Sequence, residues 1–279
     1  MRFIFGLIAA LLISSAYGQT AITPGLYALT DCMDYHYGAG NWTKRTGVGQ
    51  GSDIGPALTD CLTAIRGSTG RGRILVNPGV WLMTNPPTTS LLSGNQIEGF
   101  GSQSSKVVYN QSGGIAFYFS GSNGFTGGGI RGLGILLEQG MGDSTAYAIA
   151  LIGNSQYQPD QSLWEDLYIS ALGESYWWET FHVDGTARTV PQGVRVGSMH
   201  NVQLFRSHNV GLYLANVVQW DIVNVGVYVG MGSGNDVYIT GSGTQLTNST
   251  QVDAIRLQYG GQLNATNCSK VRVNYVGVC

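Results

Sequence analysis

The sequence predicts an all-β fold, a parallel β-helix (solenoid) with a capping helix near its N-terminal end, from three observations. Short phrases that alternate apolar and polar residues recur in the last third of the chain: 193–196, 211–214, 236–239, 254–257 and 270–273. Equivalent apolar positions in these phrases are separated by 18, 25, 18 and 16 residues. Gly accounts for 42 of the 279 residues, whereas charged residues are only 11%. A unit of about 20 residues cannot bury its own apolar face, so stacked coils with Gly and Asn at their corners are expected.

The first residues are predicted to be a secretory signal peptide rather than part of the fold. Arg2 precedes an apolar run at 4–13, and small residues at 16–18 precede an expected cleavage site before Gln19. The run is too short to span a membrane, although an uncleaved anchor is the alternative. We therefore expect residues 1–18 to be removed and the protein to be secreted, whether extracellular, periplasmic or surface-associated.

The rest of the chain is expected to hold an irregular segment, 19–50, and a single β-helix domain, 51–279. The net charge is −2, and the 14 Lys and Arg residues are scattered, which argues against a nucleic-acid partner. No second apolar run reaches the length of a membrane span, so no membrane partner is expected after signal cleavage. The apolar content of 43% argues against a disordered chain.

Four cysteines, in an exported protein, predict disulfides: Cys32, Cys61, Cys268 and Cys279. Three pairings are open. Because the ends of a solenoid lie far apart, Cys32–Cys61 and Cys268–Cys279 are favoured, with four reduced, buried thiols as the alternative. No Cys/His spacing indicates a structural metal, so no cofactor is expected, and calcium is the one ion that the Asp content allows.

Residues 53–66 predict one helix, which Ser52 or Asp53 can cap and Gly67 can end. Its apolar residues fall on one face, namely Ile54, Leu58, Leu62 and Ile65. An amphipathic helix directly before a solenoid can cover the open end of the core.

Two strand-like stretches follow this helix. Residues 72–81 read Gly-Arg-Ile-Leu-Val-Asn-Pro-Gly-Val-Trp, and residues 97–102 read Ile-Glu-Gly-Phe-Gly-Ser. Together with the helix they resemble the opening of the pectate-lyase superfamily, in particular the rhamnogalacturonase/epimerase-like pectate lyase group and the phage tailspike depolymerases built on it. Trp81 stands where that group usually has Tyr. The resemblance implies a right-handed parallel β-helix, but the motifs of the polygalacturonase-type hydrolases and calcium-dependent pectate lyases are not found, so it does not imply a reaction.

Residues 164–184 interrupt the strand rhythm and are predicted to leave the coil stack as long loops. They hold five of the chain's acidic residues and six aromatic residues. Acids beside aromatic rings suit carbohydrate, because rings stack on sugar C–H faces and carboxylates act as acid and base. The predicted catalytic residues are Glu174, Glu179 and Asp184, with His182 as a base. The predicted sugar platform is Trp177 and Trp178 together with Tyr176.

Several of these residues have other interpretations. Trp164 could lie in the core. Trp177 and Trp178 are adjacent, so in an extended stretch one would point inward and one outward. His182 could be a surface or simply hydrogen-bonded residue.

A second candidate surface lies on the strands themselves. Arg195, Tyr213, Tyr238 and Arg256 occupy the middle of successive phrases and are predicted to form one outward ladder. Such a ladder could bind an anionic polysaccharide through Arg–carboxylate contacts. The alternative is a solvated outer face.

These observations predict a secreted, polysaccharide-active protein, a lyase or glycoside hydrolase acting on an acidic polysaccharide. The first alternative is a non-catalytic glycan-binding or adhesion protein, which an unbroken face of Tyr, Asn and Thr without a close carboxylate pair would favour. The others are a phage or viral spike module and a structural surface or fibre protein, which could form homo-oligomers or head-to-tail filaments.

Overall fold

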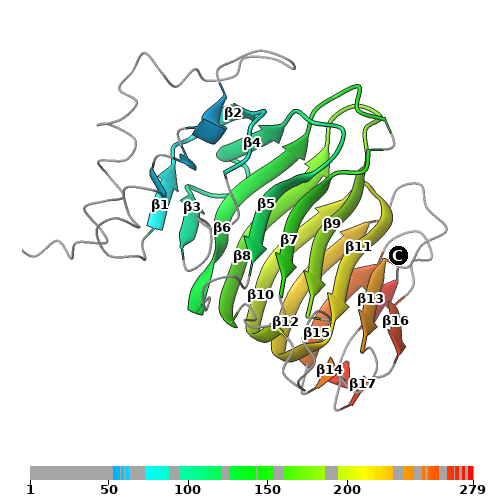
Figure 1. The fold of residues 1–279 in the computed structure, drawn as a ribbon. Coiled ribbons are helices and arrows are strands. Elements are labelled where there is room, and N and C mark those ends of the chain that lie inside the picture. The colour runs from blue at the N-terminus through cyan, green and yellow to red at the C-terminus, as the bar shows by residue number, and fades with distance from the viewer. Residues whose placement is uncertain are drawn as a thin grey trace, which may run out of the picture.

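The computed structural model describes residues 53–56, 58–59, 61–62, 73–87, 95–120, 126–142, 144–153, 160–185, 194–228, 236–241, 247–248, 251–257, 263–266, 268–269, 272–273 and 276–278. Apart from helical residues between 54 and 62, the regular structure described is β-strand, arranged in two parallel sheets that face each other (Figure 1). The predicted all-β class is confirmed. The predicted segments 1–18 and 19–50 lie outside the described residues.

The large sheet has thirteen strands. They are β1 (Arg73–Val76), β2 (Gly79–Met83), β3 (Gln96–Gly99), β4 (Ser105–Tyr109), β6 (Thr126–Leu137), β8 (Asp160–Ala171), β10 (Val194–Phe205), β12 (Val217–Tyr228), β14 (Thr247–Asn248), β15 (Gln251–Leu257), β17 (Cys268–Ser269), β18 (Arg272–Val273) and β19 (Val276–Val278). The small sheet has six strands, β5 (Ile115–Ser120), β7 (Tyr147–Ile152), β9 (Trp177–Asp184), β11 (Ser207–Ala215), β13 (Val237–Thr240) and β16 (Leu263–Thr266).

From β5 to β14 the chain alternates between the sheets, and every described strand pair is parallel (Figure 1). In the large sheet Ile130 pairs with Trp164, 34 residues later, and Trp164 pairs with Met199, 35 residues later. The predicted fixed period near 20 is therefore wrong, because the step between paired residues is 21 at the C-terminal end of the large sheet but rises to 35 earlier in the chain. Val194 lies in the large sheet and Leu212 in the small one, so the recurring phrases mixed steps between sheets with steps within a sheet.

The long strands of the large sheet bend at residues with a left-handed backbone. Asp166, Asn201 and Asn224 have φ values of 50°, 54° and 54° and occupy equivalent positions in β8, β10 and β12. The side chain of Asn224 donates a hydrogen bond of 2.7 Å to that of Asn201. Asn and Asp tolerate this conformation better than other residues with a side chain, which explains their use at these corners.

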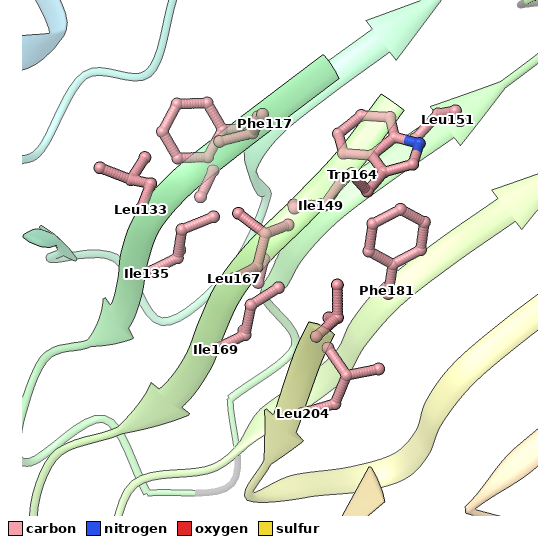
Figure 2. Packing of buried hydrophobic residues seen from close by; sticks show 14 of the residues in the cluster. Phe117, Leu133, Ile135, Ile149, Leu151, Trp164, Leu167, Ile169, Phe181 and Leu204 are labelled. Carbon is pink, nitrogen blue, oxygen red and sulfur yellow. The ribbon is translucent and has the colours of Figure 1, made fainter. Parts of the chain in front are cut away.

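Apolar side chains from both sheets fill the space between them. Figure 2 shows Phe117, Leu133, Ile135, Ile149, Leu151, Trp164, Leu167, Ile169, Phe181 and Leu204 in this core. Trp164 is 0% exposed and makes edge contacts with Phe119 and Phe181 at centroid distances of 5.1 and 5.0 Å. The sequence left open whether Trp164 belongs to the predicted loop or to the core, and the structure places it in the core.

The helical residues near the N-terminal end close one side of this core. Asp53 caps them, because its Oδ1 accepts a hydrogen bond from the Gly55 amide at 2.9 Å, and the same atom accepts one from the Thr84 amide after β2. The predicted apolar face is confirmed for the residues described, which are buried in the core: Ile54, Leu58 and Leu62. Ile65 lies outside the described residues.

The prediction that residues 164–184 form long loops is wrong. They supply most of β8 and all of β9, and only residues 172–176 connect the two strands. The regular spacing of strand phrases was interrupted here because each turn of the chain takes more residues than the step that the phrases predicted.

Cys61 is buried and disulfide-bonded. The predicted Cys32–Cys61 and Cys268–Cys279 pairings stay predictions, because Cys32 and Cys279 lie outside the described residues.

No helix in the described part of the chain is both long enough and apolar enough to cross a membrane.

Candidate functional site

The outer face of the small sheet carries a row of aligned, mostly aromatic side chains. Its members occupy one register position on six neighbouring strands: Tyr118, Ala150, His182, Tyr213, Tyr238 and Asn264. Each lies next to inward-facing core residues along its strand, so parallel pairing places all six on the outer face. We call these six residues the aromatic row.

Three neighbouring rings of the aromatic row contact one another across the strands, and one of these contacts is a parallel stack. His182 lies parallel to Tyr213, with ring centroids 4.6 Å apart and an interplanar angle of 8°, and Tyr213 is 5.7 Å from Tyr238. Tyr147 meets His182 edge-on at 5.3 Å. Stacked rings cover each other's faces. His182 and Tyr213 therefore present mainly ring edges and polar atoms to a ligand, which suits hydrogen bonding more than the stacked sugar platform expected from the sequence.

Glu179 lies beneath the row and orients His182. It is 4% exposed. Its Oε2 is 2.6 Å from Nδ1 of His182, and its Oε1 accepts a 2.7 Å hydrogen bond from the side-chain amide of Asn209. A neutral imidazole that donates from Nδ1 keeps Nε2 as an acceptor, so the contact selects one tautomer. Because both carboxylate oxygens are bonded within the protein, Glu179 is a positioning group rather than a surface acid.

Three tyrosines of this face, Tyr118, Tyr147 and Tyr213, have raised pKa values and stay neutral well above pH 7. Burial, then the charges of Asp184 and Glu179, raise the pKa of Tyr213. Burial and Glu179 also raise the pKa of Tyr147, although a hydrogen bond with Trp178 opposes the change. Burial raises the pKa of Tyr118. These phenols are therefore hydroxyl donors under ordinary conditions.

The small sheet carries negative charge and no positive charge from Lys or Arg. The six described strands contain Glu179 and Asp184 but neither Lys nor Arg. Beside the row, the hydroxyls of Thr240 and Thr266 lie 2.9 Å apart, and Tyr238 reaches Thr266 at 3.4 Å. The resulting surface of Tyr, Asn and Thr side chains is polar and mildly acidic.

The structure brings together some of the predicted catalytic residues but not all. Glu179, His182 and Asp184 lie on β9, with Glu179 and His182 in direct contact. Glu174 lies apart, exposed in the turn between β8 and β9, where it lines a shallow pocket.

The predicted sugar platform is divided between core and surface. Trp177 is 0% exposed, stacks on Tyr109 at 5.8 Å and donates its indole N–H to the Ser170 carbonyl. A platform role for Trp177 is therefore wrong, because no ligand can reach its ring in this structure. Trp178 is half-buried on the outer side, 5.7 Å from the His208 ring. Adjacent residues of a strand point to opposite faces, which was the alternative interpretation of this pair.

The predicted ladder of Arg195, Tyr213, Tyr238 and Arg256 is not a single ladder. Tyr213 and Tyr238 pair with each other in the small sheet. Arg195 pairs with Val218, whereas Arg256 pairs with Gly226, and both pairs belong to the large sheet. The prediction is wrong because the four phrases come from two different sheets.

Sequence reasoning missed four residues of this face: Tyr118, Tyr147, Asn209 and Asn264. Each looks ordinary in the sequence, and only the pairing of strands places it next to a member of the row or to Glu179. The one usable signal was the absence of Lys and Arg from the strand-like stretches concerned.

The described residues hold no group of three or more His, Cys, Asp or Glu side chains that could bind a metal ion. On the large sheet, Ser198 and Asp221 both approach Nε2 of His200, at 3.0 and 3.5 Å. A catalytic relay needs the carboxylate on the other ring nitrogen, so this cluster does not form one.

No family model and no curated protein matches this sequence. Among solved structures, the chain is similar to ORF18 of Geobacillus virus E2 at 12% identity and a TM-score of 0.33, over 83% of this chain and 58% of that chain. It is also similar to the catalytic unit of the thermostable GH87 alpha-1,3-glucanase from Streptomyces thermodiastaticus strain HF3-3 at 9% identity and a TM-score of 0.23, over 86% of this chain and 70% of that one. The chain thus spans little more than half of the phage protein. At these TM-scores neither similarity assigns a function to this chain.

Proposed function

We propose that the protein binds an extended, uncharged polysaccharide across the outer face of the small sheet, on a right-handed parallel β-helix. The aromatic row carries this proposal. The alternation of the chain between two parallel sheets supports the scaffold, because each small-sheet strand then repeats the same outward position.

The shape of the aromatic row suits a polymer rather than a small molecule. It crosses six strands, and strands lie about 4.8 Å apart, so it extends about 24 Å from β5 to β16. Hydroxyl and amide groups recur along it, and they can bond to the repeating hydroxyls of a glycan chain. A flat row of this length favours a linear ligand over one that fills a closed pocket.

The charge of the face favours an uncharged polymer over the acidic one expected from the sequence. Glu179 and Asp184 would repel a polyuronate, and the strands of the small sheet supply no cation to offset that repulsion. Binding to a neutral glycan should also change little with salt, because no ion pair across the interface would be screened.

Retention on immobilised or insoluble polysaccharides tests this function. The protein, with its disulfides intact, is passed over cellulose, β-1,3-glucan, mannan and xylan, and over polygalacturonate and alginate. Tyr213→Ala and Tyr238→Ala remove hydroxyls from the row, and we expect each to weaken retention about tenfold, as loss of one good interface contact does. Tyr228→Ala is the matched control, because Tyr228 is a half-buried tyrosine stacked on Phe205 at 4.4 Å on the large sheet. Retention on polyuronates alone, abolished by salt, would refute the proposal.

The contact between Glu179 and His182 favours a second candidate, cleavage of the bound glycan with His182 as general base. Nε2 of His182 has no hydrogen-bond partner recorded among the described residues. Hydrolysis by two carboxylates is less well supported. Glu179 and Asp184 are five residues apart on one strand, about 16 Å along its axis, whereas such pairs work at about 5–9.5 Å.

Release of new reducing ends from the same polymer panel distinguishes cleavage from binding alone. Absorbance from unsaturated uronates is followed for the two polyuronates, where it would identify cleavage by a lyase. If His182 is the base, His182→Ala abolishes product release and Tyr228→Ala does not. Retention without any product from the polymer panel would leave binding as the function.

A further inference from the structure

A surface pocket lies away from the aromatic row, where two turns of the chain meet. The turn after β6 and the turn after β8 border an open, shallow pocket of about 480 Å³, lined by Gln139, Gly140, Gly142, Gly173 and Glu174. This volume is within the usual range for small-molecule sites.

Hydrogen bonds between the two turns hold the walls of this pocket in place. The Met141 amide donates to the hydroxyl of Ser175 at 2.9 Å, and the Tyr176 amide donates to the Gly142 carbonyl at 2.9 Å. The hydroxyl of Ser144 donates to the Tyr176 carbonyl at 2.7 Å. Ser144 and Ser175 are buried. The pocket is therefore formed before any ligand arrives, which lowers the entropy cost of binding.

The turn between β10 and β11 also contacts the turn after β8, which forms one side of the pocket. Arg206, between β10 and β11, donates a hydrogen bond to the Gly173 carbonyl and lies over the Tyr176 ring, 5.7 Å from its centroid. Its charge is thus directed at the backbone and the ring. Among the described residues that line the pocket, Glu174 carries the charge.

The groups facing the pocket are polar and available. Glu174 and Gln139 are exposed, and neither has a hydrogen-bond partner recorded among the described residues. Side chains added at Gly140 or Gly142 would meet nothing within 4 Å, so the backbone there is open to a ligand. A Cβ at Gly173, where φ is 60°, would lie 2.8 Å from Cγ of Gln139, so glycine at this position leaves the Gln139 side chain its place.

We propose that this pocket is a separate carbohydrate site that holds a single sugar residue, a chain end or a branch, through the Glu174 carboxylate and the Gln139 amide. A carboxylate can accept hydrogen bonds from two neighbouring hydroxyls, and an amide both donates and accepts. The negative charge of Glu174 excludes an anionic ligand. The choice of a sugar as ligand rests on the proposed function, but the site itself is independent of the aromatic row.

Amide NMR of the ¹⁵N-labelled protein tests this site directly. Methyl glycosides of glucose, galactose, mannose and xylose serve as single-residue probes, and linear and branched pentasaccharides distinguish a chain end from a branch. We expect at least one methyl glycoside to shift the amide signals of Gly140, Gly142 and Gly173 while those of Tyr213 and Tyr238 stay unchanged. Glu174→Gln should weaken this binding about tenfold, because a hydrogen bond to a charged group is lost. Asp221→Asn, at an exposed acid of the large sheet, is the matched control and should bind as the unchanged protein does.

Each outcome separates this site from the function proposed for the row. If no glycoside shifts the three glycine signals, or if Glu174→Gln binds equally well, the pocket proposal fails even when polysaccharides are retained. If the glycine signals shift while no polymer is retained, the pocket stands and the proposed function of the row fails. Shifts caused by calcium chloride alone, lost in Glu174→Gln and not produced by any sugar, would overturn the pocket proposal in favour of a cation site.

Discussion

Replacing Glu179 by Ala should destabilise the protein far more than replacing any exposed acid. The side chain is 4% exposed and accepts hydrogen bonds from His182 at 2.6 Å and Asn209 at 2.7 Å. A hydrogen bond to a charged group contributes about 1.5–3 kcal/mol. We use the lower value because the side chains of His182 and Asn209 are only partly buried and water can replace part of what they lose. Two such bonds give a loss of about 3 kcal/mol in the free energy of unfolding.

Urea unfolding at pH 7, followed by tryptophan fluorescence, measures this loss. For a domain of this size, about 3 kcal/mol corresponds to a fall of about 6–12 °C in Tm. Glu179→Gln should lose roughly half as much, because its oxygen can serve one donor while its NH₂ faces the other. Glu174→Ala is the control, since it removes an exposed acid without a recorded partner and should change stability by less than about 0.5 kcal/mol.

A double-mutant cycle with His182→Ala isolates the contact itself. The sum of the two single losses should exceed the loss in the double variant, with a coupling of about 1 kcal/mol for two side chains in direct hydrogen-bond contact. If Glu179→Ala unfolds at the same urea concentration as Glu174→Ala, or if the cycle shows no coupling, the account of Glu179 as a buried positioning group is refuted.

Burial raises the pKa of Tyr109 to about 12. The stabilisation from its neutral form is present below pH 10 and lost as pH rises toward 12, so the free energy of unfolding should fall by about 2 kcal/mol over that range, and Tyr109→Phe should remove this part of the pH dependence. Trp177→Ala should cost about 3–5 kcal/mol in urea unfolding, as expected for a fully buried ring. Trp178→Ala, on the outer side of the same strand, should cost clearly less, and equal losses would contradict the assigned faces. Asn201→Val should cost about 2 kcal/mol, because a β-branched residue is strained at a φ of 54° and the bond from Asn224 is lost. Asn201→Gly should cost less than half of that, and the reverse order in thermal unfolding would disprove the corner conformation.

Local patterns in the sequence were sufficient for the class of fold and for the buried face of the helix. The alternation of apolar and polar residues predicts strands and tells which side chains share a face, because successive side chains of a strand point to opposite sides. The apolar spacing from Ile54 to Leu62 predicts the helical face that the core buries. The lack of Lys and Arg in the strands of the small sheet, which sets the charge of its outer face, is likewise written in the sequence.

The tertiary structure alone decided which strands are neighbours, and with it the candidate site. Residues that pair across strands are 21 to 35 positions apart in the large sheet, and the spacing varies with the length of each turn, so no fixed period reveals it. This is why Arg195 and Tyr213 looked equivalent but lie in different sheets. The contact between Glu179 on β9 and Asn209 on β11 likewise depends on which strands are neighbours. Alternation within a strand is local and can be read from sequence, whereas register between strands depends on turn geometry and core packing, which exist only in the folded chain.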